Sequence, residues 1–323
     1  MTAAHRRLAV RLGGYSPPDS SHGRGLARIA ELFRQLVDTD VDVEIDYNVL
    51  DAGRQAHDLL DEVEAGGFTL CYFSTSYLTE RVPEVGIIDL PYLFRSPGHA
   101  HRVLDGEFGR EVSERTSRST GLVPLAYWDN GIRHLSNSVR PVLTPEDCIG
   151  LRVRLQPSWA HESYFRALGA VPWCTDLRQG IEMLRAGAVD AQENPLANFV
   201  TYGIHRLHRH LTLTAHAFGA RGLYASSLQL AGWPAAHREA LARAAAQAAE
   251  EQRTAARRSD LDLEAWLGDR CMVVALTADQ RSAFEEAAQP VLERARKRLG
   301  GRLLDLVGGD GEGPTSTFQS SRV

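Results

Sequence analysis

The alternation of strand patterns with helix patterns along the first half of this chain constrains its fold more than any other feature. Residues 8–12 predict a strand, and residues 26–37 place apolar side chains on one face of a helix. Residues 41–47 then alternate as a second strand, and a polar helix leads to a third strand at 68–73. Because helices that alternate with strands cover a mostly parallel sheet, we expect an α/β fold.

The second half predicts a second α/β domain. Asn130-Gly131 is a turn dipeptide, so we expect it to separate a strand that ends at Trp128 from a strand over 132–137. Ala, Glu, Gln and Arg dominate residues 235–258, and these strong helix formers predict a long helix. The other elements expected along the chain are a helix over 99–115, a strand that carries Arg154, helices over 159–168 and 177–184, strands over 188–192, 211–217 and 223–230, and a helix over 277–302.

Composition and charge exclude several classes of protein. The net charge of −5 is spread over 323 residues and not gathered in blocks, which argues against a nucleic-acid partner. No stretch approaches the roughly 20 apolar residues of a membrane span. The four cysteines lie far apart and lack the spacing of metal ligands, so we expect buried free thiols, no metal and no cofactor.

The first residues lack the apolar region of a secretion signal. Arginines interrupt every candidate window in MTAAHRRLAVRLGGYS. Two alternatives stay open, a protein that remains inside the cell and a protein whose leader lies outside this sequence. At the other end, GGDGEGPTSTFQSSRV has the composition of a disordered tail, which we place at 308–323.

Arg154 is the first candidate for ligand binding. Its strand alternates apolar residues with Arg152, Arg154 and Gln156, so both arginines share one face. They cannot both be buried without an anionic partner, and we expect one of them to face a ligand. Arginine presents a planar fork that meets a carboxylate through two hydrogen bonds, which suggests a carboxylate clamp. The alternative is an arginine on a solvated face of the sheet.

Arg133 and Asn194 are the next candidates. If the strands of Arg133 and Arg154 are neighbours, their guanidinium groups converge, and only an anion offsets the repulsion between them. Asn194 lies in the run 192–195, where a strand ends and a helix begins. It can cap that helix, and it can donate to a ligand at the carboxyl end of the strand, where helix amino termini also favour anions.

Aromatic residues fall at or near the predicted strand ends, where they would line a crevice. Each is either pocket lining or core, and the two tryptophans are favoured as lining because an indole N–H needs a partner. These residues are Tyr15, Phe73, Tyr77, Tyr127, Trp128 and Trp173. His205, His208 and His210 lack the spacing of a zinc site, so we expect a solvated basic connector there.

A series of motifs in the middle of the chain is similar to one known family. The motifs are TERVPEVGIIDLPYLF (79–94), WDNGIR (128–133), TPEDCIGLRVRLQPS (144–158), ALGAVP (167–172), GAVDAQENP (187–195) and HLTLTAH (210–216). In this order they resemble the substrate-binding proteins of TRAP transporters, the family that includes the C4-dicarboxylate binders. The resemblance spans about 140 residues.

The resemblance implies a two-lobed α/β fold like that of periplasmic binding proteins, with hinge strands and a long helix that spans both lobes. It implies a receptor that captures a small organic acid in the cleft between the lobes and delivers it to TRAP membrane subunits, without catalysis. It also implies a location outside the cytoplasmic membrane. The expected lobes are 1–128 with about 211–250, and 129–210 with about 251–307.

Carried over residue by residue, the resemblance makes Arg154 the principal carboxylate arginine, Arg133 the second arginine and Asn194 the amide contact. The chain departs from the family at Leu177, where many relatives have Phe, and Trp173 stands where a smaller residue is usual. We therefore expect Trp173 to form an aromatic wall. The site residues expected in full are Arg154, Arg133, Asn194, Trp173, Trp128, Tyr15, Phe73 and Gln156.

Two other functions stay open at the level of the sequence. One is an intracellular enzyme that acts on an acidic small molecule on a similar scaffold, with His22 or His216 as its base. The other is the sensing module of a regulator, although the sequence contains no helix-turn-helix segment and no basic run that would face DNA.

Overall fold

The computed structural model describes residues 7–308, which form two compact units. Within the described range, unit 1 comprises residues 7–74, 113–129 and 221–258, and unit 2 comprises residues 75–112, 130–220 and 259–308. The segment 75–112 thus belongs to unit 2, whereas the sequence places it with the first lobe. Apart from Gly308, the expected tail over 308–323 lies outside the described residues.

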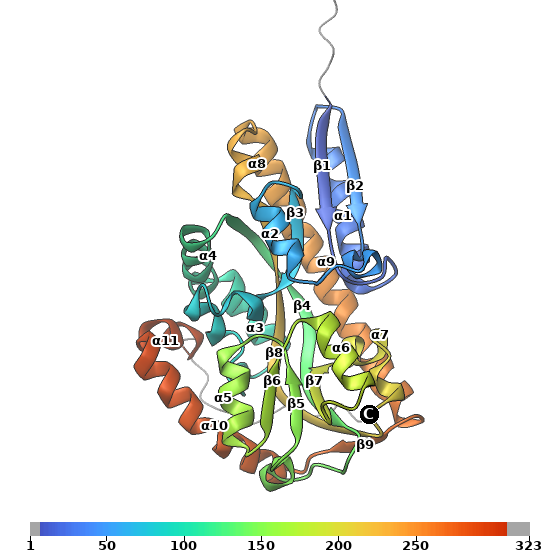
Figure 1. Ribbon diagram of the computed structural model, residues 1–323. Coiled ribbons are helices and arrows are strands. Elements are labelled where there is room, and N and C mark those ends of the chain that lie inside the picture. Colours follow the sequence, from blue (N-terminus) through green and yellow to red (C-terminus); the bar gives the residue numbers. More distant parts are fainter. Residues whose placement is uncertain (1–6, 309–323) are drawn as a thin grey trace, which may run out of the picture. The chain divides into compact units, whose positions relative to one another are not determined.

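Unit 1 contains a mostly parallel sheet built on β1 (Leu8–Gly13). Strand β1 pairs in parallel with β2 (Val41–Asp46) on one side and with β3 (Leu70–Ser74) on the other. Residues 221–225 of β8 (His210–Ser226) then pair with β3 in the antiparallel sense. Helix α1 (Ser21–Leu36) packs against β2, and Figure 1 shows both in blue. The α/β order predicted for the first half is confirmed.

Local sequence explains where the elements of unit 1 begin and end. The hydroxyl of Ser20 accepts the N–H of Gly23 and caps α1, and Leu26, Ile29 and Phe33 give the helix its buried face. Helix α2 (Asp58–Glu64) ends just before Gly66, whose φ of 79° is a conformation that glycine adopts without strain.

Strands β4 (Leu122–Asn137) and β8 are each one long strand. The turn expected at Asn130-Gly131 is wrong, because β4 continues through both residues, and Gly131 takes a φ of 95° inside the strand. The two strands expected over 211–217 and 223–230 are likewise one strand, which ends at Ser226, where α8 (Ser227–Ala231) begins. Pairing with neighbouring strands overrides the local turn signals here.

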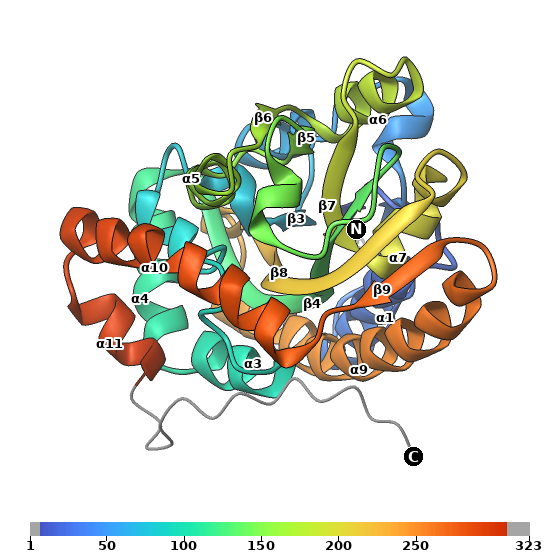
Figure 2. The ribbon, with the colours of Figure 1, turned by 90° about the horizontal axis from the view of Figure 1, so that it is seen from below.

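Unit 2 contains a mixed sheet with the strand order β4, β7 (Ala191–Pro195), β5 (Arg152–Leu155) and β6 (Val171–Cys174). Strand β7 is antiparallel to β4 and parallel to β5, and β6 is parallel to β5 at the edge. Strand β9 (Met272–Ala275) runs parallel to the start of β8, beside it in Figure 2. The sequence did not predict β6 or β9.

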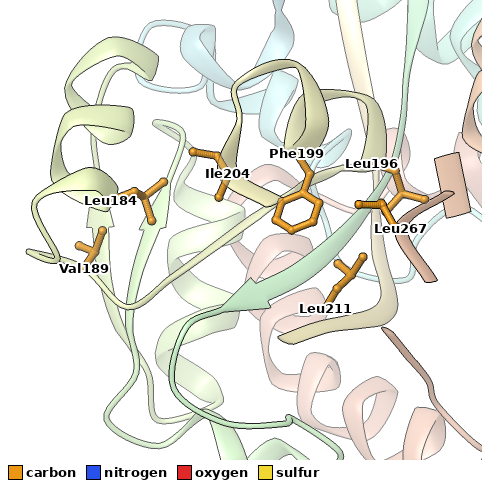
Figure 3. Close-up of a cluster of buried hydrophobic side chains, with 7 residues drawn as sticks. All are labelled: Leu184, Val189, Leu196, Phe199, Ile204, Leu211 and Leu267. Carbon is orange, nitrogen blue, oxygen red and sulfur yellow. The ribbon is translucent and has the colours of Figure 1, made fainter. Parts of the chain in front are cut away.

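A buried apolar cluster anchors the segment that follows β7. It joins α7 (Leu196–Thr201) to the end of α6 (Leu177–Arg185) and to the last turn of α9 (Ala235–Gly268). Figure 3 shows Phe199 between Ile204 and Leu196. Its buried members are Leu184, Val189, Leu196, Phe199, Ile204, Leu211 and Leu267. Because these side chains are closely packed, the end of β7 has a fixed position in unit 2.

The remaining elements complete the two units. The helix expected over 99–115 is two helices, because Gly106 ends the first of them. Helix α10 packs against α5.

Between residues 7 and 308, no helix is both long enough and apolar enough to cross a membrane. The remaining helices are α3 (Pro97–Asp105), α4 (Glu107–Ser119), α5 (Trp159–Ala167), α10 (Ala278–Leu299) and α11 (Arg302–Gly308), and short 3-10 turns are Val49–Ala52, Thr75–Leu78, Pro83–Ile87, Pro145–Cys148 and Ile204–Arg206.

Candidate functional site

Arg154 is a buried arginine of β5 in unit 2, with 3% of its surface exposed. Its Nη2 donates to the backbone oxygen of Thr175 at 2.8 Å, and its Nε donates to the Thr175 hydroxyl at 3.4 Å. Tyr77 also hydrogen-bonds to the guanidinium. Burial raises the pKa of Tyr77, although the charge of Arg154 opposes that shift. These contacts fix the plane of the guanidinium, and its remaining N–H groups are the ones that could bind a carboxylate.

The two arginines of β5 have different surroundings. Arg152 is exposed and makes a bidentate pair with Asp190, with Nη2–Oδ1 at 2.6 Å and Nε–Oδ2 at 2.9 Å. No carboxylate among the described residues forms such a pair with Arg154. The expectation that the two arginines cannot both be buried without an anionic partner is confirmed, and Arg154 is the one that is buried.

Arg133 forms a fully buried ion pair with Glu193. Its Nη2 donates to Glu193 Oε1 at 2.7 Å and to the Glu193 backbone oxygen at 3.1 Å, and its Nε donates to Oε2. The Nη1 of Arg133 is buried and has no hydrogen-bond partner within residues 7–308. Arg133 therefore has most of its charge neutralised inside unit 2, and one NH₂ group stays available for a further acceptor.

Glu193 also has two histidines beside it. The sequence reasoning missed the role of Glu193. The Nε2 of His216 lies 3.4 Å from Glu193 Oε2, and the Nδ1 of His161 lies 3.8 Å from Oε1. Burial alone would raise the pKa of Glu193, but attraction to Arg133 and His161 and hydrogen bonds from His216 and Arg133 hold it well below its usual range. Burial lowers the pKa of His216, against the attraction of Glu193. Glu193 is thus a carboxylate anion at neutral pH.

Asn194 lies within β7 and does not cap α7. The cap residue of α7 is Pro195, which makes no side-chain cap hydrogen bond, so the capping expectation is wrong. The reason is that β7 continues to Pro195 and pairs Asn194 with His134 of β4. The Asn194 Nδ2 donates to Gln192 Oε1 at 3.0 Å, and its Oδ1 accepts from Asn198 Nδ2 at 3.1 Å.

The strand register places three candidate side chains in one row. Gln192 of β7 and Trp173 of β6 are the direct neighbours of Arg154 on either side of β5. Residues in register on parallel strands share a face, so Gln192, Arg154 and Trp173 lie on the same face of the sheet. Asn194, two residues beyond Gln192, shares that face, whereas Glu193 lies on the other. Trp173 is 46% exposed on the edge strand, and its role as a wall stays a prediction.

Gln156, the residue that follows β5, is held by a hydrogen bond of 2.6 Å from its Nε2 to the hydroxyl of Ser76. Both residues belong to unit 2. Unit 2 therefore contains five of the eight expected site residues, which are Arg154, Arg133, Asn194, Trp173 and Gln156.

Unit 1 contains the other three, Tyr15, Phe73 and Trp128, within one aromatic group. The ring of Tyr15 lies 4.8 Å from that of Phe73 and 5.2 Å from that of Tyr72, and Tyr72 lies 5.4 Å from Trp128. Arg221 stacks its guanidinium over Tyr15 at 4.6 Å and over Tyr72 at 5.1 Å. Cation–π contacts of this kind stabilise a buried guanidinium.

Arg221, which the sequence reasoning missed, and His22, which it named only as a possible base, also belong to this group. Burial and the nearby charge of Arg221 lower the pKa of His22 well below its usual value, so its imidazole is neutral at pH 7. The indole N–H of Trp128 and the Nε2 of His22 are buried without a hydrogen-bond partner among the described residues. The available signal for Arg221 was an arginine in the apolar run HAFGARGLYAS, where a solvated side chain is not expected.

The histidines of the HRLHRH segment are not a uniformly solvated connector. His208 is buried, and its Nδ1 lies 3.0 Å from the hydroxyl of Ser136. Burial lowers its pKa to about 4, against the attraction of Asp190. The solvated expectation is wrong for His208, because the side chain packs against β4. Within the part of the chain that the structure describes, no cluster of three or more His, Cys, Asp or Glu residues could hold a metal ion.

The family model and the most similar known sequences point to the same family. The family model described as bacterial extracellular solute-binding protein, family 7, matches residues 12–298. The C4-dicarboxylate-binding periplasmic protein DctP of Rhodobacter capsulatus is 28% identical over 306 residues, which cover 93% of this chain and 90% of that protein. A solute-binding protein of Verminephrobacter eiseniae is 30% identical over 305 residues, which cover 94% of this chain and 90% of that protein.

Solved structures agree with this assignment. A TRAP periplasmic solute-binding protein of Sulfurospirillum deleyianum with bound succinate has a TM-score of 0.87 and 28% identity, covering 94% of this chain and 98% of that chain. The sugar-acid-binding protein of Advenella mimigardefordensis in complex with galactonate has a TM-score of 0.88 and 26% identity, covering 95% of this chain and 99% of that chain. The resemblance stated from the motifs and the predicted fold class are both confirmed. The chain belongs to family 7 of the bacterial extracellular solute-binding proteins, the substrate-binding proteins of TRAP transporters.

Proposed function

We propose that this chain is the extracytoplasmic receptor of a TRAP transporter, and that it captures a small organic acid through Arg154 and delivers it to the membrane subunits. The observation that carries the proposal is the buried guanidinium of Arg154, which no carboxylate among the described residues neutralises. A buried cation that lacks a counter-charge is strongly disfavoured, and a bound carboxylate supplies that charge. Its orientation by Thr175 prepares it for a bidentate contact.

Arg133 and Asn194 support Arg154 in this proposal. The second N–H of Asn194 Nδ2 lies on the face of Arg154 and can add a hydrogen bond to the acid. Arg133 lies on the opposite face with Glu193, so its unpartnered Nη1 would reach the acid beyond the end of β7. Tyr15, Phe73 and Trp128 of unit 1 would contact the remainder of the ligand, and Gln156 and Trp173 would line its surroundings in unit 2.

The relatives with printed ligands support an acid as the solute. The Sulfurospirillum deleyianum protein holds succinate and the Advenella mimigardefordensis protein holds galactonate, at 28% and 26% identity to this chain. Succinate is a dicarboxylate and galactonate is a sugar acid, so the feature that the two ligands share is a carboxylate. A carboxylate is also what an oriented arginine fork recognises best.

The test is a thermal-shift screen of the full chain over dicarboxylates, sugar acids and keto acids, followed by calorimetry. A ligand present at 100 times its dissociation constant should stabilise the native state by about 2.7 kcal/mol. Mass spectrometry of the released ligand should recover it unchanged, whereas an enzyme that used His22 or His216 as a base would convert it. A chain that binds no acid, or that consumes the acid, would exclude the receptor proposal.

A further inference from the structure

Gln192 carries a buried hydrogen-bond donor that the site described so far does not use. The residue lies in the middle of β7 with 2% of its surface exposed, and its Nε2 has no hydrogen-bond partner within residues 7–308. A buried amide donor without a partner costs about 1 to 3 kcal/mol. Such a group in a binding site points to a ligand atom that accepts its hydrogen bond.

A chain of amides determines which end of Gln192 is available. Gln192 Oε1 accepts from Asn194 at 3.0 Å, and Asn194 Oδ1 accepts from Asn198 at 3.1 Å. The same Asn198 amide also lies 3.4 Å from Asn130 Oδ1. The acceptor atoms of Gln192 and Asn194 are therefore occupied, and Gln192 presents its NH₂ group.

The register places this NH₂ group beside Arg154. Gln192 is the direct neighbour of Arg154 on the adjacent strand, on the same face, and adjacent strands lie about 4.8 Å apart. On its other side Gln192 is in register with Ser136, whose hydroxyl is engaged with His208 at 3.0 Å. Gln192 is thus the neighbour of Arg154 on β7, on the face where a carboxylate held by Arg154 would lie.

We infer that Gln192 is a further ligand-binding residue and that its Nε2 recognises an oxygen on the carbon next to the carboxylate, so that the ligand is a 2-hydroxy or 2-oxo acid. This inference rests on the proposed function. The fork of Arg154 occupies both carboxylate oxygens, and the next acceptor along such an acid is the oxygen on C2. A neutral amide donor suits a neutral hydroxyl or keto oxygen, whereas a second carboxylate would call for another cation.

The experiment measures selectivity between acids that differ only in the oxygen on C2. Malate is compared with succinate, and gluconate with 2-deoxygluconate, by calorimetry on the full chain. We expect the parent to prefer the hydroxy acid in at least one pair by about threefold to tenfold, the value of one hydrogen bond to a neutral group. In Gln192→Met that preference should fall below about twofold, while the deoxy acid still binds.

Two further variants separate ligand contact from structural support. Asn198→Ala removes the partner of Asn194 without touching Gln192, and it should keep the preference for the hydroxy acid. Gln192→Glu keeps an oxygen for Asn194 but replaces the donor with a negative charge. It should therefore weaken the binding of every acid more than tenfold. Circular dichroism and thermal melting of each variant check that the fold is intact.

Three results would overturn the inference. They are a parent that binds both members of each pair equally, a loss of preference in Asn198→Ala as large as that in Gln192→Met, and a Gln192→Glu variant that binds as tightly as the parent. A parent that binds none of the acids of the wider screen would instead overturn the proposed function on which the inference rests.

Discussion

Arg133 and Glu193 form an ion pair in which both side chains are almost completely buried, with 1% and 0% of their surfaces exposed. Strand pairing explains the contact, because β4 and β7 run antiparallel with Arg133 opposite Pro195 and Leu135 opposite Glu193. His161 and His216 lie on the remaining sides of the carboxylate. The sequence suggested two arginines that bind the ligand. In the structure, Arg133 has a counter-ion inside the protein, whereas Arg154 has none among the described residues.

Removing the charge of Glu193 should destabilise the fold. Glu193→Gln leaves the guanidinium of Arg133 buried without a counter-ion, and a broken buried pair of this kind costs about 3 to 5 kcal/mol. Urea unfolding of the variant and the parent at pH 7 measures the difference. The control is Glu182→Gln, which breaks an exposed pair with Arg178 and should leave the free energy of unfolding unchanged. Equal stability of Glu193→Gln and the parent would contradict this account of the buried pair.

Loss of Arg154 should abolish most of the affinity for the acid. Truncation of one partner of a desolvated charge pair costs about 2 to 5 kcal/mol, so Arg154→Ala should weaken binding by roughly thirtyfold to several thousandfold. Arg152→Ala is the matched control, since Arg152 lies two residues away on the same face but is exposed and paired with Asp190. Calorimetry with the acid found in the screen decides between them. Binding by Arg154→Ala within threefold of the parent would remove Arg154 from the site.

Gly180 should matter for affinity more than for stability. A Cβ at this position of α6 would lie 2.3 Å from Arg154 Nε and 2.9 Å from its Cδ, so the arginine side chain must move in Gly180→Ala. Alanine is favoured over glycine inside a helix by about 1 kcal/mol, which offsets part of the clash in the free energy of unfolding. We expect at least a tenfold loss of affinity while the melting temperature changes little.

The control for that variant is Gly98→Ala in α3, where the nearest atom to a new Cβ is 3.9 Å away. It should change neither affinity nor fold. If Gly180→Ala binds the acid as tightly as the parent, the position of the Arg154 guanidinium does not determine binding.

Trp173 should affect ligands according to their size. Its side chain lies next to Arg154 on the same face but is 46% exposed, so a ligand that reaches beyond the carboxylate can cover it. Trp173→Ala should therefore weaken the binding of bulky or aromatic acids more than the binding of small dicarboxylates. Affinities for one acid of each class, measured on the variant and the parent, test this. Losses of the same size in both classes would refute a wall at Trp173.

The sequence predicted the features of the fold that depend on local patterns. The strands β1 and β2 follow from their apolar periodicity, and the long helix α9 follows from its strong helix formers. The family motifs extended this to the TRAP substrate-binding proteins, because several motifs in one order are specific. These predictions needed no knowledge of which strands are neighbours.

The features that the sequence did not predict depend on strand neighbours. The pairing of Arg133 with Glu193 requires β4 and β7 to be adjacent, and nothing in either segment alone indicates it. The turn expected at Asn130-Gly131 was wrong for the same reason, since pairing extends β4 through a dipeptide that would turn in isolation. Gln192 was overlooked because its unpartnered amide becomes visible only once the partners of Asn194 are known.

The burial of His208 should make the fold sensitive to acid. Its pKa falls from the ordinary 6.5 to about 4 in the folded chain, so the unfolded chain binds the proton more readily. This neutral histidine therefore stabilises the fold fully above pH 6.5, and that contribution is lost as the pH falls from 6.5 toward 4. A shift of this size corresponds to roughly 3 kcal/mol.

Replacing His208 by Gln keeps a polar group near Ser136 but removes the titration. Urea unfolding at pH values between 7 and 4 should show a free energy that falls less steeply for His208→Gln than for the parent across this window. The exposed His57, replaced in the same way, is the control, because its side chain lies at the surface. Parallel pH profiles for His208→Gln and the parent would show that His208 titrates alike in the folded and unfolded chains.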